Sequence, residues 1–369
     1  MTRDPGLVSW LQLSLTPGLG ATAIRGMLRQ FGLPQAVLER RRSELTAHAA
    51  AAVIEALDSQ SVRDAVARAL DWAAAPGHDV VTLADEHYPR ALLETPDPPP
   101  VLYALGRIEL LQHPSLAIVG SRNATAQGEH NAESFAKALS NAGLTIVSGL
   151  AIGIDAAAHR GGLAGTSSTI AVLGTGIDVV YPRRNTELVA AIAERGLLVS
   201  EFPLGTAPLA HNFPRRNRLI SGLAQGCLVV EAALASGSLI TARTAADQGR
   251  EVFAIPGSIH SPLSKGCHAL IKSGAKLVES AEDVLAELAG FRRSSTASTV
   301  QSSASGAELA TGLLAHMGGD RVDVESLCAR AGMSAEQVSS ELLRLELDGR
   351  VTPLPGGLFQ RLEKPSARK

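Results

Sequence analysis

Short apolar runs alternate with amphipathic stretches through the middle of the chain. The runs are rich in β-branched residues and continuous rather than alternating, which is typical of strands buried on both faces of a sheet. Helical patterns fill the intervals between them, and this alternation predicts a doubly wound, mostly parallel α/β sheet. The predicted strands lie at residues 116–119, 144–147, 169–173, 197–199, 227–230, 252–255 and 276–278.

The pattern before residue 76 is helical instead. The segment Pro17–Gly20 separates two helical stretches, and the second carries Ile24, Leu28 and Phe31 at helical spacing. This resembles a helix-hairpin-helix or a related small (SAM-like) helical domain, in which a glycine turn lets backbone amides approach a DNA phosphate. A hairpin that only packs is the alternative. Residues 45–75 are rich in alanine and also predicted to be helical.

The approach to the main sheet is a predicted strand at 80–83 followed by a proline-rich segment, residues 97–106. A triple proline cannot join a helix or a central strand, so we expect an extended connector there. Residues 292–306 are rich in serine and threonine without apolar periodicity, which predicts a flexible linker. The predicted parts are a helical domain at 1–76, a sheet domain at 77–291, the linker at 292–306 and a C-terminal domain at 307–369.

The C-terminal domain shows helical patterns at 308–316, 324–331 and 335–347, followed by a β-hairpin pattern at 349–361. Three helices and a wing resemble a winged-helix domain. A DNA reader of this kind needs a basic recognition helix. The third helix instead carries several carboxylates against the single Arg344. We therefore expect a protein-interaction or regulatory role for this domain.

Composition narrows the class of protein. The chain has 369 residues, 45% hydrophobic and 19% charged, which is enough for more than one folded domain. The formal net charge is −2, so a nucleic-acid site must come from local clustering of basic residues. Three scattered cysteines without metal-ligand spacing indicate reduced thiols in a cytoplasmic protein. We see no apolar run long enough for a membrane helix and no secretory signal, so we expect no membrane partner.

Loops at the carboxyl ends of the parallel strands carry the candidate chemistry, because ligands bind at that edge of such sheets. Several of these loops place glycine or serine at a helix start, where unpaired amides and the helix dipole favour an anion. Neither the G-x-G-x-x-G fingerprint nor a phosphate loop with its lysine is present, which disfavours a nicotinamide enzyme or a P-loop ATPase. The arginines that can add paired hydrogen bonds to phosphate are Arg122, Arg183, Arg184, Arg215, Arg216 and Arg218.

The densest cluster lies at residues 211–218, which we interpret as a short turn that holds three of these arginines next to Phe213. Phe213 is the stacking candidate, because stacking of a base on an aromatic ring is worth roughly 1–3 kcal/mol and tolerates any sequence. Packing of the ring beneath the turn is the alternative. A buried strand then ends at Glu231, and the small-residue loop 236–238 opens the next helix.

Candidate catalytic groups are few. Asp155 and His159 lie four residues apart on a predicted helix and could form a general acid–base pair. An aspartate in a first helical turn more often caps the backbone, and the histidine can simply pack or hydrogen-bond. Glu231 has no base, nucleophile or metal cluster beside it, so we interpret it as a brace for the Ser236–Ser238 loop. Cys227 lies within a strand pattern and is expected to be buried.

Taken together, these loops resemble the DNA-processing protein A (DprA/Smf) family. The motifs that carry the likeness occur in order over roughly residues 80–280, and His268, where asparagine is more usual, is a minor departure. They include Ala117-Ile-Val-Gly-Ser-Arg122, Ser148-Gly-x-Ala-x-Gly-Ile-Asp155, Leu173-Gly-x-Gly-Ile-Asp178, Asn212-Phe-Pro-x-Arg-Asn-Arg218, Ser236-Gly-Ser-Leu-Ile-Thr-Ala242 and Gly249-Arg-x-Val-Phe-Ala-x-Pro-Gly257.

The resemblance implies an extended Rossmann-type domain that binds single-stranded DNA. It also implies a protein that protects incoming DNA in natural transformation, loads the RecA recombinase and forms a homodimer through this domain, without enzymatic activity or a cofactor. The sequence does not decide whether Arg215 or Arg216 faces DNA. The predicted DNA-binding set is Gly120, Ser121, Arg122, Ser148, Gly149, Gly153, Arg183, Arg184, Asn212, Phe213, Arg215, Arg216, Asn217, Arg218, Gly237 and Ser238.

Two other functions stay open at this point. The fold also resembles that of nucleoside-monophosphate phosphoribohydrolases, which use a glycine-rich loop and a glutamate at a strand end. Their Pro-Gly-Gly-x-Gly-Thr loop does not precede Glu231 here. A regulator of double-stranded DNA is the third possibility, and the acidic third helix of the C-terminal domain argues against it.

Overall fold

The computed structural model describes residues 5–288 and parts of the chain from 317 to 361. Contacts divide the chain into two compact units, residues 1–294 and 295–369, and each is described by itself. The four domain boundaries proposed above stay predictions. The described C-terminal stretches are 317, 322–331, 333–334, 337–338, 341–342, 345, 351–354 and 358–361.

The first unit begins with a small helical region. The predicted turn at Pro17–Gly20 joins its first two helices, and Gly18 has a φ of +82°, which glycine adopts without strain. Leu13, Ile24 and Met27 are buried in a core of this region. The helices are α1 (Pro5–Leu15), α2 (Ala21–Phe31), α3 (Pro34–Leu38), α4 (Arg42–Leu45), α5 (Ala51–Glu55) and α6 (Gln60–Trp72), with the 3-10 turn η1 (Ala56–Asp58).

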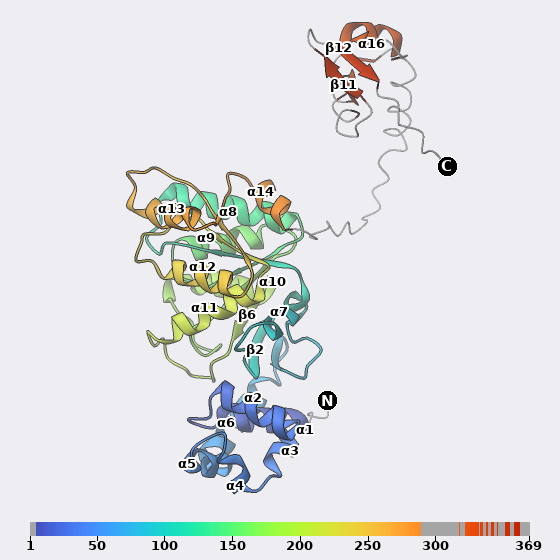
Figure 1. The fold of residues 1–369 in the computed structure, drawn as a ribbon. Helices are drawn as coiled ribbons and strands as arrows, with labels where there is room; N and C mark the ends of the chain where they lie inside the picture. The colour runs from blue at the N-terminus through green and yellow to red at the C-terminus, as the bar shows by residue number, and fades with distance from the viewer. Residues whose placement is uncertain are drawn as a thin grey trace, which may run out of the picture. The chain divides into compact units, whose positions relative to one another are not determined.

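A nine-stranded sheet follows, with strand order β1-β2-β6-β5-β4-β3-β7-β8-β9. Figure 1 draws the helical region in blue and the sheet domain that follows it in the chain in cyan to orange. Strands β3 to β9 are parallel, as predicted. The chain builds outward from β3 through β4, β5 and β6, then returns to place β7 on the other side of β3. The strands are β1 (His78–Thr82), β2 (Val101–Gly106), β3 (Ser115–Val119), β4 (Thr145–Ser148), β5 (Thr169–Val172), β6 (Leu197–Ser200), β7 (Gly226–Val229), β8 (Glu251–Ala254) and β9 (Lys276–Leu277).

The return to β7 creates a topological switch point. Loops after β3 and β7 diverge there, because the helices that follow these strands lie on opposite faces of the sheet. In open α/β sheets, the crevice at such a point is where ligands bind. The fold therefore directs attention to the segments just after residues 119 and 229.

The prediction of a connector at residues 97–106 is wrong in part. Residues 101–106 form β2, which pairs antiparallel with both β1 and β6 inside the sheet. The prolines at 98–100 precede the strand, so its ladder loses no N–H donor. Proline therefore excludes only its own positions from a central strand, and the strand can begin at the next residue.

Helices cover both faces of the sheet. One face packs against α8 (Ala126–Asn141), α9 (Ile154–Leu163), α10 (Thr186–Arg195) and α14 (Ala281–Glu287). The other packs against α7 (Arg90–Leu93), α11 (Asn212–Leu223), α12 (Gly237–Asp247) and α13 (Lys265–Lys272). Cys227 is fully buried in the second layer, as predicted. Short 3-10 turns are η2 (Ile108–Gln112), η3 (Arg183–Asn185) and η4 (Pro262–Ser264).

Helices α8 and α9 lie closely against one another. A Cβ atom at Gly161 of α9 would stand 2.2 Å from the carbonyl oxygen of Glu133 and 2.7 Å from the side chain of Ala136, both in α8. A Cβ atom at Gly165 would meet the side chain of Ser140 at 2.4 Å. Glycine at 161 and 165 thus permits a helix contact that a larger residue would force apart.

The second unit contains a small antiparallel sheet of order β10-β12-β11. The predicted helix at 324–331 is confirmed as α16 (Val324–Ala331), and the predicted hairpin as β11 (Val351–Leu354) and β12 (Leu358–Arg361). The remaining strand is β10 (Val322–Asp323). The helix predicted at 308–316 and most of the one at 335–347 lie outside the described residues. Across the described stretches of both units, none of the helices has the length and apolar character to cross a bilayer.

Candidate functional site

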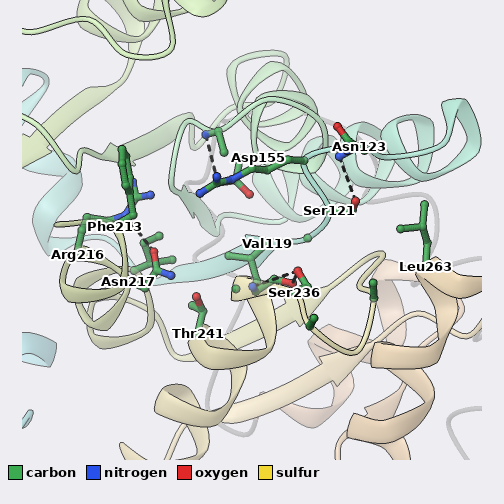
Figure 2. A pocket seen from close by; sticks show the side chains of 18 residues that line it. Val119, Ser121, Asn123, Asp155, Phe213, Arg216, Asn217, Ser236, Thr241 and Leu263 are labelled. Carbon is green, nitrogen blue, oxygen red and sulfur yellow. Dashed lines mark hydrogen bonds between the residues drawn. The ribbon is translucent and has the colours of Figure 1, made fainter. Parts of the chain in front are cut away.

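A cavity of about 470 Å³ opens at the switch point of the sheet. Figure 2 shows Phe213, Arg216 and Asn217 of α11 along one side, with Ser121 and Asn123 from the loop after β3 across from them. The start of α12 forms a further wall. The residues that line the cavity include Gly120, Ser121, Arg122, Asn123, Asp155, Phe213, Arg216, Asn217, Ser236, Gly237, Ser238 and Thr241.

Two walls of this cavity offer donors to an anion. Helix α12 starts at Gly237 against the cavity, so its positive dipole end faces the space. Ser236 caps that helix by accepting a hydrogen bond from the Ser238 N–H at 3.3 Å. Opposite, Arg122 is exposed, and its guanidinium carbon lies 5.9 Å from the ring centre of Phe213. The cavity thus joins an exposed cation, a helix start and an aromatic face.

Two glycines of the predicted set, Gly120 and Gly153, are required by the close approach of two loops. A Cβ atom at Gly120 would lie 2.7 Å from the side chain of Ile154 and 2.9 Å from the carbonyl oxygen of Glu231. Gly153 has a φ of +74°, and a Cβ atom there would meet the carbonyl oxygen of Ser121 at 2.4 Å. These residues shape the cavity wall through backbone packing.

Arg216 and Asp155 form the charged floor of the cavity. Arg216 is only 4% exposed, and its guanidinium donates to the carbonyl oxygen of Gly149 at 2.7 Å and to that of Val172. Asp155 accepts the Ala151 N–H at 3.3 Å, which confirms the backbone-capping interpretation. Burial lowers the pKa of Arg216 to about 10, so it stays charged at neutral pH. Burial raises the pKa of Asp155, while the nearby arginine opposes that shift.

His159 does not complete an acid–base pair at this site. Its ring is fully buried, and Nδ1 lies 2.7 Å from the Thr169 hydroxyl. Burial lowers the pKa of His159 to about 3, so the ring is neutral at physiological pH. The structure supports the packing interpretation of this residue.

Glu231 braces a different loop from the predicted one. Its carboxylate accepts hydrogen bonds from the Thr125 N–H at 2.9 Å and the Thr125 hydroxyl at 2.6 Å. Its main-chain oxygen accepts the Ser121 N–H at 2.7 Å. Glu231 therefore holds both ends of the 121–125 loop, and the expected brace of Ser236–Ser238 is wrong. Sequence alone could not supply this partner, because pairing of β3 with β7 brings the two segments together.

Residues 212–218 are not a turn, because they form the first turns of helix α11. The helical period places Phe213, Arg216 and Asn217 on the side that lines the cavity. Arg215 and Arg218 face away from it. Arg216 therefore belongs to this cavity, and Arg215 does not line it.

Acidic partners occupy the arginines on the outer side of α11. Arg218 donates to the Glu201 carboxylate and to the main-chain oxygen of Asp97. Arg215 lies 3.3 Å from the same Glu201 carboxylate, and its side chain is 52% exposed. Burial raises the pKa of Glu201, and the two arginines oppose the shift. Arg215 also lines a separate cavity of about 340 Å³ next to the Gly18–Gly20 turn.

The remaining predicted residues are spread more widely. Ser148 is buried and donates to the carbonyl oxygen of Ile118 at 2.6 Å, within the sheet. Asn212 is also buried, at the start of α11. Arg183 and Arg184 are exposed on η3, and Arg184 lines a third cavity between α9 and α10.

A narrow cavity of about 150 Å³ lies on the other side of Phe213. Phe213, Arg122 and Arg216 line both this cavity and the larger one, so the phenyl ring stands between them. Tyr181 lines the narrow cavity, and its ring centre lies 5.6 Å from that of Phe213. Tyr181 is a cavity residue that the sequence reasoning did not connect with Phe213. In the described ranges, no cluster of three or more His, Cys, Asp or Glu side chains is placed to hold a metal.

These features define a Rossmann-like α/β protein with a glycine-rich, cationic site at its switch point. The family model for DNA recombination-mediator protein A matches residues 79–289, and the DprA winged helix domain matches residues 297–357. The chain belongs to the DNA recombination-mediator protein A (DprA/Smf) family. The predicted family and the predicted winged-helix domain are thereby confirmed.

Relatives resemble the chain over most of its length. It is 44% identical over 310 residues to protein Smf of Escherichia coli (strain K12), which covers 82% of each chain. A solved structure of DNA processing protein A from Streptococcus pneumoniae matches with a TM-score of 0.68 and 39% identity, covering 78% of this chain and 99% of that one. DNA processing protein A from Helicobacter pylori, solved to describe its single-stranded DNA binding mode, gives a TM-score of 0.52 at 31% identity, covering 57% of this chain and 95% of that one.

Proposed function

We propose that this chain is a non-enzymatic single-stranded DNA-binding protein that protects incoming DNA in natural transformation and loads RecA onto it. The observation that carries the proposal is the cavity in which Arg122, the α12 start and the ring of Phe213 meet. Phosphate donors beside an aromatic platform suit a strand whose bases are free to stack. The DNA-binding relative from Helicobacter pylori supports the ligand, and the family's recombination-mediator description supports the RecA step.

Each wall has a separate task in this proposal. Arg122 contacts phosphate oxygens, and the positive dipole end of α12 attracts them. Phe213 stacks against a base without reading its edge, so binding tolerates any sequence. Arg216 adds positive potential from below while its hydrogen bonds to Gly149 and Val172 fix the floor.

Structural hydrogen bonds support the non-enzymatic part. The Glu231 carboxylate is held by Thr125, and His159 is buried against Thr169. Neither group is free to move a proton at the cavity. Incubation of the protein with nucleoside monophosphates should release no free base. Release of base that stops on Glu231→Gln would support a phosphoribohydrolase instead.

We further propose a cytoplasmic homodimer formed through the sheet domain. Strand β9 stands at one edge of the sheet, and both of its residues, Lys276 and Leu277, are exposed. Leu277 is 50% exposed, so this edge carries an apolar side chain that a second copy could cover. The free thiols of Cys227, Cys267 and Cys328 agree with a reducing compartment. Light scattering of the purified chain measures its oligomeric state, and a monomer at micromolar concentration would contradict the dimer.

The decisive experiment compares single- and double-stranded DNA in an anisotropy titration at several salt concentrations. Wild-type protein should prefer single strands, and its affinity should fall as salt rises because counterions are released. Arg122→Ala should weaken binding about tenfold, the loss expected for a charge-assisted contact. Unchanged affinity in that variant would remove the site assignment. RecA strand exchange with and without the protein tests the loading step separately.

A further inference from the structure

A second arginine-bearing groove lies beside the candidate site, between α9 and α10. It has a volume of about 430 Å³. Only Arg184 among its basic residues belongs to the DNA-binding set predicted from sequence. The lining side chains that matter here are Arg160, Arg184, Asn185, Glu187, Leu188 and Arg195.

The groove adjoins the narrow cavity that lies next to Phe213. Tyr181 and Pro182 line that cavity, and Arg184 lines the groove. Two residues of extended chain span at most about 7 Å, so the two spaces are close neighbours. Asn185, which lines the groove, donates to the carbonyl oxygen of Leu150 in the cavity wall at 2.9 Å.

The arginines along the groove differ in whether they form ion pairs. Arg160 is paired, with its guanidinium 3.3 Å from Glu129 and 3.2 Å from Glu133. Arg184 and Arg195 are exposed, and neither forms an ion pair with any residue in the described part of the chain. Glu187 is the acidic residue in the lining. These two unpaired guanidiniums lie at opposite ends of α10, about 15 Å apart along the helix, so they suit two phosphates of one strand that are not neighbours.

The floor of the groove is apolar. Leu163, Leu188 and Ala191 line it between the cationic side chains. A single strand presents sugar and base surfaces as well as phosphates, and apolar walls between cations match that alternation. A small acidic ligand would make no favourable contact with these apolar side chains.

We propose that single-stranded DNA leaves the main site past Tyr181 and runs into the α9–α10 groove. There, Arg184 and Arg195 contact its phosphates, and Leu188 packs against a sugar or base. This inference rests on the proposed function, since it extends the same strand beyond the Phe213 site. It makes Arg195, which no sequence motif singled out, a DNA-contacting residue.

The proposal predicts a dependence on DNA length. A short oligothymidine of about 4 nucleotides fills the main site alone, whereas one of about 16 nucleotides also reaches the groove. The double variant Arg184→Ala/Arg195→Ala should bind the long strand about three- to tenfold more weakly than wild type, with no change for the short one. The salt dependence of long-strand binding should become shallower, because two phosphate contacts are lost.

Glu187→Gln gives a test of opposite sign. Removal of the acid from the groove should tighten binding of the long strand, about two- to fivefold, and leave the short strand unchanged. Arg68→Ala is the matched control for the arginine variants, because Arg68 is exposed on α6 and lines none of the cavities described above. Equal melting temperatures across the set establish that each variant folds.

The outcomes separate this proposal from the one it rests on. Wild-type and Arg122→Ala proteins that bind neither strand would overturn both. Normal binding of both lengths by the double variant, with an unchanged salt dependence, would overturn the groove alone. Equal weakening for both lengths would also overturn it, because the arginines would then belong to the main site.

Discussion

The two sides of helix α11 carry arginines of very different character. On the inner side, Arg216 is buried above Asp155 and lines the cavity at the sheet's switch point. On the outer side, Arg215 and Arg218 meet the carboxylate of Glu201. The sequence presents these residues within four positions of one another, as a single basic cluster. Their environments divide that cluster into a part that lines the cavity and a part that holds the helix to the rest of the unit.

The division shows that a run of arginines is weak support for a binding surface until its partners are known. Asp97 links the outer network to the helical region, since it pairs with both Arg25 of α2 and Arg218. The outer arginines therefore join two parts of the first unit. The exposed cation beside the cavity is Arg122, which has the ring of Phe213 as its neighbour.

The largest expected effect is on stability. Arg216→Ala would leave the buried carbonyl oxygens of Gly149 and Val172 without their donor and would remove the cation that opposes burial at Asp155, and each buried group left unsatisfied costs about 1–3 kcal/mol. Urea unfolding followed by circular dichroism measures this loss. Arg215→Ala is the matched control, for which we expect a change of no more than about 1 kcal/mol because the side chain is half exposed. Equal losses for the two variants would erase the distinction between the sides of α11.

We expect the DNA affinity to depend on Phe213, which lies on the inner side of α11. Phe213→Ala should weaken single-strand binding about tenfold or more, because one stacked base is worth about 1–3 kcal/mol. Phe213→Tyr keeps an aromatic face and should retain most of the affinity. Anisotropy with labelled oligothymidine measures both variants. If the alanine variant binds like wild type, the ring only packs against Tyr181 and separates the two cavities.

We also expect the stability of the fold near Arg216 to depend on acid, through the buried His159 of α9. Burial and the nearby Arg216 hold the pKa of His159 near 3, against an ordinary value of 6.5. Below pH 6.5 the unfolded chain therefore binds a proton that the folded chain refuses, and stability falls as the pH falls toward 3. We expect a loss of about 2 kcal/mol between pH 7 and pH 5 from this residue.

The test compares His159→Gln with His130→Gln. Replacement of the buried ring should flatten the decline in unfolding free energy between pH 7 and pH 5. The exposed His130 of α8 should leave the decline unchanged when replaced. A decline of the same steepness in all three proteins would show that other groups govern the acid response.

The smallest effect is expected for DNA binding by Arg215→Ala. Its guanidinium is held by Glu201 and lines a cavity apart from the main site, so we expect less than about a threefold loss of affinity. The same titration as for Phe213→Ala measures it. A loss as large as that of Arg122→Ala would bring the outer side of α11 into the DNA path.

The sequence predicted the parallel sheet well because each buried strand has a continuous apolar signature. It failed at β2, where the neighbouring prolines masked a strand that begins only at Val101. It also took the start of α11 for a turn, so the helical period could not be used to separate Phe213 and Arg216 from Arg215. With the helix assigned, the spacing of three residues between 213 and 216 alone would have placed them on one side.

Long-range partners were beyond the reach of local patterns. The bond between Glu231 and Thr125 depends on which strands become neighbours, and that is decided by the topology of the whole sheet. Tyr181 is a similar case, because its contact with Phe213 joins two loops from different strands. Residue types and strand ends indicated the edge of the sheet, but only the fold identified which side chains meet there.

The glycine contact between α8 and α9 has a consequence for the entropy of association. The loops that precede these helices, residues 120–125 and 149–153, are both set by the position of one tightly locked helix pair. In the proposed complex, loops held in this way would leave the free-energy penalty of ordering largely to the DNA. Gly161 does not line the cavity, and it would then influence affinity by preorganising the loops that do.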